Sequence, residues 1–140
     1  KRYVCIDSSP KVVLAAAERL KKWPSVSVLK ADMHDLPFDA RQFDLVLMMH
    51  ALSYTRKPAQ VIEEAARVLK PKGQLLLSCL LKHGHRSVVE PFGHENLGFS
   101  QKELIRHAEK SGLSVKHCEV VSRERRAPHF EILMLLAEKP

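Results

Sequence analysis

The chain has 140 residues, of which 45% are hydrophobic, so it can form the core of one globular domain, or of part of one, and is too short for two. It holds no run of about 18 apolar residues, and its three cysteines lie far apart without a CxxC pair, which excludes a transmembrane helix, a disulfide framework and a zinc-finger spacing. We therefore expect a soluble, cytoplasmic protein with reduced cysteines. The net charge of +7 comes from scattered basic residues, with RERR at 123–126 the densest cluster, and predicts a solvated basic surface rather than a nucleic-acid site.

The first 30 residues predict a strand, a helix and a second strand. An apolar run from Tyr3 to Ile6 ends at Asp7, and Ser9 followed by Pro10 is typical of a helix start, where proline takes the first helical position. The helix should have one apolar face and end before Pro24. Alternating valines at 26 and 28 then indicate the second strand.

The middle of the chain predicts another strand, helix and strand. Phe43 to Met49 is almost wholly apolar, as in a parallel strand buried on both faces, and we expect this strand to be central in its sheet. Pro58 opens a helix with one apolar side, and the LKPKG segment closes it before a strand from Leu75 to Ser78.

The last third begins with a polar segment and ends in a hairpin. Residues 82–99 are rich in histidine and glycine and have no period, so they predict a long functional loop or a lid. Ser100 and Glu103 form the capping box of a helix that ends at Gly112. The two final strands are expected at 113–121 and 130–137.

This alternation predicts an α/β domain with a doubly wound, mostly parallel sheet, helices on both faces and a C-terminal antiparallel hairpin. In such sheets the ligand lies beyond the carboxyl ends of the strands. The candidate site residues therefore follow the strands: Asp7, Asp32, His50 and the start of the loop after residue 80.

Four stretches, read in order, resemble the class I S-adenosylmethionine-dependent methyltransferases: YVCIDSSP, KADMHDLPF, FDLVLMMHALSY and ARVLKPKGQLLLS. The later segment GFSQKELIRHAEKSGL is also similar to this family. The chain looks closest to the small-molecule branch, and in particular to methyltransferase domains fused to a winged-helix repressor of the arsenic-repressor type. The resemblance implies a Rossmann-like fold and S-adenosylmethionine as cofactor.

The resemblance assigns cofactor contacts to four residues. Asp7, with Ser8 beside it, matches the carboxylate that accepts the ribose hydroxyls, although a carboxylate here could also cap the following helix. Asp32 matches the acceptor for the adenine amine, and Met33 the residue that covers the adenine ring. An ordinary loop carboxylate and a core methionine are the alternatives for these two positions.

His50 follows the most apolar strand and should face the sulfonium end of the cofactor. It could line the pocket, act as a general base for a hydroxyl or amine, or be a buried, hydrogen-bonded histidine. Tyr54, His83, His85 and His94 could order a substrate, or be surface residues. No carboxylate or cysteine completes a zinc site with the histidines, so we expect no metal.

The family's glycine-rich loop and first strand are absent from this sequence, since none of its five glycines precedes Gly73. In the family's strand order, 3-2-1-4-5-7-6, the absent strand lies between the strand ending at Asp7 and the strand ending near Met49. We therefore expect residues 1–140 to be a partial methyltransferase domain, cut from a longer protein whose upstream segment supplies the central strand. A smaller departure is Lys72, where the family usually has glycine in a turn.

The sequence thus predicts an enzyme that transfers a methyl group from S-adenosylmethionine to a small molecule by in-line displacement. A non-catalytic S-adenosylmethionine-sensing domain of a transcriptional regulator is the alternative. A nucleic-acid methyltransferase is disfavoured because HALSY, after the fourth family strand, does not resemble the Asn/Asp-Pro-Pro-aromatic signature.

Overall fold

A computed structural model describes all residues from Lys1 to Pro140. The chain forms two compact units, Lys1–Phe38 and Asp39–Pro140, called here the N-terminal and the C-terminal unit. None of the helices has the length and apolar character needed to span a bilayer.

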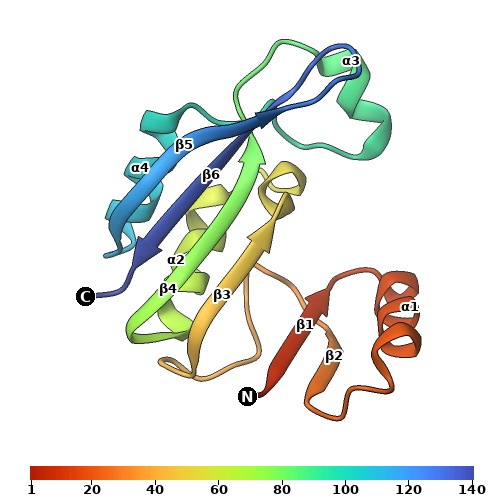
Figure 1. The fold of residues 1–140 in the computed structure, drawn as a ribbon, viewed down its shortest axis with the longest axis vertical. Helices are drawn as coiled ribbons and strands as arrows, with labels where there is room; N and C mark the ends of the chain where they lie inside the picture. The colour runs from red at the N-terminus through yellow and green to blue at the C-terminus, as the bar shows by residue number, and fades with distance from the viewer. The chain divides into compact units, whose positions relative to one another are not determined.

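The N-terminal unit is a strand–helix–strand element. Strands β1 (Tyr3–Asp7) and β2 (Val26–Lys30) pair in parallel, and α1 (Pro10–Leu20) connects them (Figure 1). The Ser9 hydroxyl accepts a hydrogen bond of 3.4 Å from the Val12 N–H, and proline stands in the first turn. The predicted helix start is therefore confirmed.

The C-terminal unit contains a four-stranded sheet in the order β3-β4-β6-β5. The first two strands pair in parallel, and the pairs β4–β6 and β5–β6 are antiparallel, which confirms the predicted hairpin. Its elements are β3 (Phe43–Met49), η1 (Ala51–Tyr54), α2 (Pro58–Val68), β4 (Leu69–Leu80), α3 (Arg86–Val89), η2 (Glu90–Phe92), α4 (Gln101–Lys110), β5 (Ser114–Arg123) and β6 (Glu131–Glu138).

The core of this unit lies between its sheet and the helices α2 and α4, both of which cover the same face of the sheet (Figure 1). The capping box of α4 is present as predicted. The apolar positions of the two helices and of the central strands supply the fully buried side chains: Val61, Ile62, Ala65, Leu75, Leu77, Leu104, Ala108, Leu133 and Leu135.

The strand β3 lies at an edge of the four-stranded sheet, whereas the sequence predicted a central position buried on both faces. Leu45, Leu47 and Met49 are 48%, 60% and 50% exposed, and only Met48 of this strand is buried. The physical reason is the break in pairing: β1 and β3 belong to separate sheets, as expected if a strand is absent between them. Within the C-terminal unit, α2 and α4 lie on one face of the sheet.

Two further segments differ from the sequence-based prediction. The strand β4 already begins at Leu69, because the LKPKG segment pairs back to Phe43 through a register shift instead of forming only a turn. Lys72 has φ of 67°, a left-handed conformation that explains the family's glycine there. The polar segment 82–99 holds the short helices α3 and η2 and is not a continuous loop.

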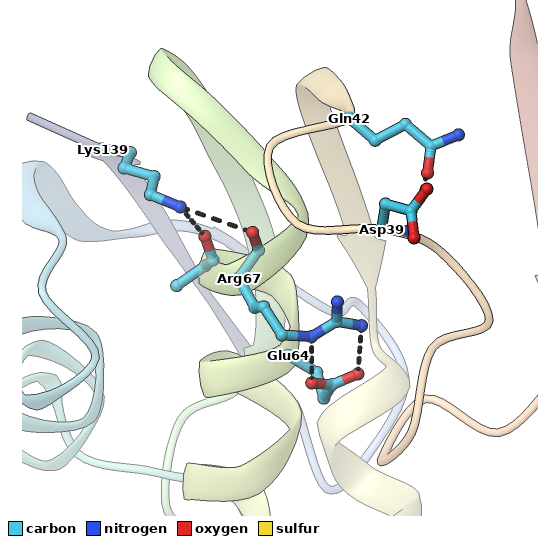
Figure 2. Close-up of polar contacts among 6 residues, drawn as sticks. Asp39, Gln42, Glu64, Arg67 and Lys139 are labelled. Carbon is cyan, nitrogen blue, oxygen red and sulfur yellow. Dashed lines mark hydrogen bonds and ion pairs between the residues drawn. The ribbon is translucent and has the colours of Figure 1, made fainter.

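Lys139, just beyond β6, closes the end of α2. Its ammonium group donates to the carbonyl oxygens of Ala66 at 2.7 Å and Arg67 at 3.4 Å (Figure 2). It also donates to the carbonyl oxygen of Leu69 at 2.8 Å. The side chain of Arg67 contacts a residue one turn earlier in α2: its guanidinium donates two hydrogen bonds, of 2.6 and 2.9 Å, to the Glu64 carboxylate. Carbonyl groups at a helix end lack partners within the helix, so a cation there satisfies them directly.

Candidate functional site

Two candidate carboxylates lie at the carboxyl edge of the β1–β2 pair. The carbonyl oxygen of Asp7 accepts a hydrogen bond of 3.1 Å from the N–H of Ala31, which brings the segment after β2 next to the end of β1. The Asp7 Oδ1 atom accepts a hydrogen bond of 2.8 Å from the N–H of Ser9, and the side chain of Ser9 caps α1. Asp7 therefore shapes the turn before the helix, and its Oδ2 atom is free to accept from a ligand.

Asp32 is an exposed acceptor on the same edge. Its Oδ1 atom accepts a hydrogen bond of 2.8 Å from the backbone N–H of His34 and lies 2.6 Å from the Nδ1 atom of the His34 ring. The backbone hydrogen bond from His34, followed by the ring contact, lowers the pKa of Asp32, so this carboxylate is ionised at neutral pH. Met33 is half-buried beside it, and Ser8 is exposed.

His50 lies in the C-terminal unit, directly after β3. Its N–H donates 2.9 Å to the carbonyl oxygen of Ser78, and its backbone is left-handed, with φ of 56°. The left-handed region is uncommon for residues other than glycine, and such residues cluster at functional sites. The residue is exposed, so the buried core position considered for it does not describe this structure.

Other aromatic rings gather beyond the carboxyl end of β4. His83 packs on Phe130 with ring centres 4.6 Å apart and stacks on His85 at 5.7 Å, and His94 meets Tyr54 edge-on at 5.2 Å. Burial lowers the pKa of His83, with smaller contributions from His85 and His94. Burial, followed by His50, also lowers the pKa of His94, so both rings are neutral at pH 7.

Two ring nitrogens of this group are buried without a hydrogen-bond partner: Nε2 of His83 and Nδ1 of His94. Buried polar atoms are nearly always paired, so both atoms are unusual. No three His, Cys, Asp or Glu side chains are placed to hold one metal ion.

Two cavities of the C-terminal unit lie near these residues. One of about 420 Å³ lies between the start of α2 and α4 and contains the ion pairs Arg56–Glu95 at 2.6 Å and Lys82–Glu103 at 2.9 Å. The other, of about 280 Å³, lies between the segment after β4 and the β5–β6 hairpin.

Sequence reasoning gave no role to Phe130 or Asn96, and it interpreted Arg123 only as part of a solvated basic cluster. The Nδ2 group of Asn96 donates to the carbonyl oxygens of Leu52 at 2.6 Å and Thr55 at 2.9 Å and so fixes the turn after β3. An asparagine in a polar segment is too common to attract notice, and no local pattern links the hairpin to the histidines.

Comparisons with known proteins agree on one family. The family described as a methyltransferase domain matches residues 1–77. A demethylmenaquinone methyltransferase of Tropheryma whipplei is 36% identical over 87 residues, which cover 62% of this chain and 35% of that protein. A tRNA U34 carboxymethyltransferase of Cellvibrio japonicus is 30% identical over 145 residues, which cover 93% of this chain and 45% of the relative.

Solved structures show the same Rossmann-like α/β fold. The [4+2]-cyclase SpnF superposes with a TM-score of 0.83 at 20% identity, covering 99% of this chain and 66% of that chain. The N-methyltransferase NodS of Bradyrhizobium japonicum, in complex with S-adenosyl-l-homocysteine, gives a TM-score of 0.76 at 20% identity, covering 99% and 67%. The chain spans less than half the length of the curated relatives named above. Since the family match covers more than half of its residues, the chain belongs to the methyltransferase domain family.

Proposed function

We propose that this chain is part of an S-adenosylmethionine-dependent methyltransferase that acts on a small-molecule acceptor. The observation that carries the proposal is the family match over residues 1–77, which includes both acidic positions at the carboxyl edge of β1 and β2. Several relatives are named as methyltransferases of small molecules or of an acyl-carrier protein, among them the demethylmenaquinone enzyme.

The N-terminal unit would hold the nucleoside part of the cofactor. Asp7 keeps its Oδ2 atom free after Oδ1 has accepted the Ser9 N–H, so it can accept from ribose hydroxyls, with Ser8 beside it. Asp32 is ionised and exposed and can accept from the adenine amine, while the half-buried Met33 can cover the ring. These acceptors fit a nucleoside, whose hydroxyl and amino groups are donors.

The C-terminal unit would order the acceptor. Bound S-adenosylmethionine presents a methyl group on a positively charged sulfur, so the leaving group is already activated. The protein then has to align the nucleophile and exclude water, and an exposed imidazole at His50 can orient a hydroxyl or amine or take its proton.

A further segment of the protein would supply the central strand. The strand β1 pairs only with β2, and β3 pairs only with β4, so each has one edge without a partner strand. Unpaired backbone donors and acceptors on such edges favour addition of another strand. We propose that this strand lies outside the 140 residues and carries the glycine-rich loop that the family resemblance implies.

The proposal is tested in the full-length protein by calorimetric titration with S-adenosylmethionine. Asp7→Ala should weaken binding about 10- to 150-fold, the effect of losing a charge-assisted hydrogen bond. Asp44→Ala, which removes an exposed carboxylate of β3, should leave the affinity unchanged. Equal affinity in wild type and Asp7→Ala, with the fold intact, would remove Asp7 from the site.

Turnover with a panel of small phenols, quinols and amines separates catalysis from sensing. If His50 is a base, His50→Ala should lower kcat roughly 10²- to 10⁴-fold with nearly normal cofactor affinity. The exposed His117→Ala is its matched control. Tight cofactor binding without methylation of any acceptor would instead favour the sensing alternative.

A further inference from the structure

The side chain amide of Asn96 joins three parts of the C-terminal unit. Its Nδ2 group donates to the carbonyl oxygens of Leu52 at 2.6 Å and Thr55 at 2.9 Å, and its Oδ1 atom accepts a hydrogen bond of 3.1 Å from the N–H of Gly98. An asparagine amide has two N–H donors, and these two carbonyl groups use both. The amide therefore has one fixed orientation, and it connects the turn η1 to the segment that precedes α4.

The backbone that Asn96 holds is buried. Leu52, Ser53 and Thr55 are 0%, 3% and 1% exposed. A second contact runs in parallel, because the N–H of Glu95 donates a hydrogen bond of 2.7 Å to the carbonyl oxygen of Ser53. Water cannot easily replace a lost donor at a buried carbonyl group, so the position of η1 depends on these contacts.

The turn η1 carries residues of the proposed acceptor site. It begins directly after His50, whose carbonyl oxygen accepts a hydrogen bond of 3.4 Å from the N–H of Ser53 and whose φ is 56°. A left-handed backbone persists only where its surroundings hold it. At the other end of η1, the ring of Tyr54 meets the ring of His94 edge-on at 5.2 Å. A shift of η1 would therefore move both His50 and Tyr54.

We propose that Asn96 is a positioning residue of the acceptor site, which holds η1 so that His50 faces the acceptor in the orientation that methyl transfer needs. This inference rests on the proposed function, because that function gives His50 an acceptor to orient. Asn96 acts through η1 and not on the reacting atoms. A misplacement of about 1 Å far from the chemistry can lower a rate roughly 100-fold, so these hydrogen bonds are able to control turnover.

Two substitutions of Asn96 separate its contacts. Aspartate has nearly the same shape but no N–H donor, so Asn96→Asp places a carboxylate oxygen against the carbonyl groups of Leu52 and Thr55 and keeps the acceptor for Gly98. Asn96→Ala removes all three hydrogen bonds without adding a charge. The contacts with η1 are lost in both variants, whereas the contact with Gly98 is lost only in Asn96→Ala.

The first measurement does not depend on turnover. Full-length protein with isotope-labelled histidine is observed by NMR without S-adenosylmethionine or acceptor, and the His50 signal is identified by its absence in His50→Ala. We expect both Asn96 variants to move the His50 signal. Lys139→Met is the control, because it also removes a donor from carbonyl groups, but at the opposite end of α2, and it should leave the His50 signal unmoved.

The second measurement is steady-state turnover with the acceptor that the wild type methylates fastest in the panel of phenols, quinols and amines. Both Asn96 variants should lower kcat about 10-fold or more and leave the affinity for S-adenosylmethionine within about 2-fold of wild type. Lys139→Met should leave kcat within about 2-fold of wild type. If the wild type methylates nothing in the panel, the proposed function fails, and the His50 signal still tests whether Asn96 positions η1.

Three outcomes would overturn the proposal: an unmoved His50 signal or a normal kcat in the folded Asn96 variants, an equal change in Lys139→Met, or a change in Asn96→Ala alone, which would assign the effect to Gly98. Melting temperatures show which variants are folded. If Asn96→Asp does not fold, the comparison of Asn96→Ala with Lys139→Met decides, since neither variant introduces a charge.

Discussion

Glu103 joins the start of α4 to the segment after β4. Its Oε2 atom accepts a hydrogen bond of 2.8 Å from the N–H of Ser100, and the Ser100 hydroxyl accepts one of 3.2 Å from the N–H of Glu103. The ammonium group of Lys82 donates a hydrogen bond of 2.9 Å to the Oε1 atom of Glu103. The Ser100 backbone hydrogen bond, followed by that from Lys82, lowers the pKa of Glu103 to about 2. A carboxyl group with a depressed pKa stabilises the fold above its unfolded pKa, and the contribution is lost as the pH falls toward the folded value.

Glu103→Ala should therefore lower the free energy of unfolding by about 1–2 kcal/mol at pH 7, the usual effect of losing a helix cap. The difference from wild type should shrink between about pH 4.5 and pH 2, where the wild-type carboxylate becomes protonated. Urea unfolding of both proteins at several pH values measures this difference in unfolding free energy. Glu109→Ala, at an exposed position of the same helix, is the control, and a loss that does not depend on pH would contradict the assignment.

At the residue scale, local sequence patterns were sufficient for the caps but not for the cavity. Ser9, Ser100 and Glu103 act on backbone groups within three residues, so their spacing reveals them. The packing of His83 on Phe130 joins residues far apart in the chain and depends on how the hairpin crosses the sheet. No pattern along the sequence contains that information.

At the scale of elements, the end of α2 depends on a residue that follows the last strand. Lys139→Met keeps the length of the side chain but removes the ammonium donor from three carbonyl groups, of which that of Arg67 still accepts from the N–H of Arg41 at 3.0 Å. The change should cost about 1–2 kcal/mol of unfolding free energy. Lys102→Met, at an exposed position of α4, should cost less than about 0.5 kcal/mol. Urea titration of both variants checks this, and equal losses would mean that the three contacts do not stabilise the helix end.

The bounds of elements with a clear hydrophobic pattern were predictable from the sequence, but the strands that pair with them were not. The strand β3 has the predicted bounds, Phe43–Met49, because its apolar run is continuous. Its position at a sheet edge follows from which strands are present, and a strand's own residues do not record that. The early start of β4 was missed because Pro71 and Gly73 are typical of turns, yet here they continue the strand through an irregular register.

At the scale of the whole molecule, the chain leaves apolar side chains exposed in both units. Val12 and Leu14 of α1 are 48% and 71% exposed, and no residue of that helix is buried. In the C-terminal unit the exposed positions of β3 lie on a strand with one free edge. Cooperative unfolding requires one contiguous, well-covered core, and each unit by itself leaves part of its apolar surface uncovered.

Because the proposed central strand lies outside them, residues Lys1–Pro140 produced alone should melt over a broad range or in two steps, and should bind a hydrophobic dye such as ANS. Differential scanning calorimetry measures the transition. The full-length protein is the control and should show a sharper transition with less dye bound. A single sharp transition of the fragment would contradict the two-unit description.

The fold class was predictable because alternating strand and helix patterns leave few topologies, and the family match agrees with it. The candidate site was predictable only in position, as the residues that follow strands. The hydrogen-bond partners and ring contacts of those side chains come from distant parts of the chain, and the local sequence pattern does not specify them. The superposition on a cyclase at a TM-score of 0.83 illustrates that the fold alone does not fix the chemistry.

The segment between β4 and α4 leaves and returns to the sheet at one point. Leu81 and Phe99 form an isolated bridge, and the N–H of Phe99 donates 3.0 Å to the carbonyl oxygen of Leu80. Gly98 permits this approach, because a Cβ atom there would lie 2.5 Å from that oxygen. This neck and the contacts of Asn96 with the turn after β3 hold both ends of the segment in place, so a change of length tolerated by the fold would fall between them, within residues 84–94.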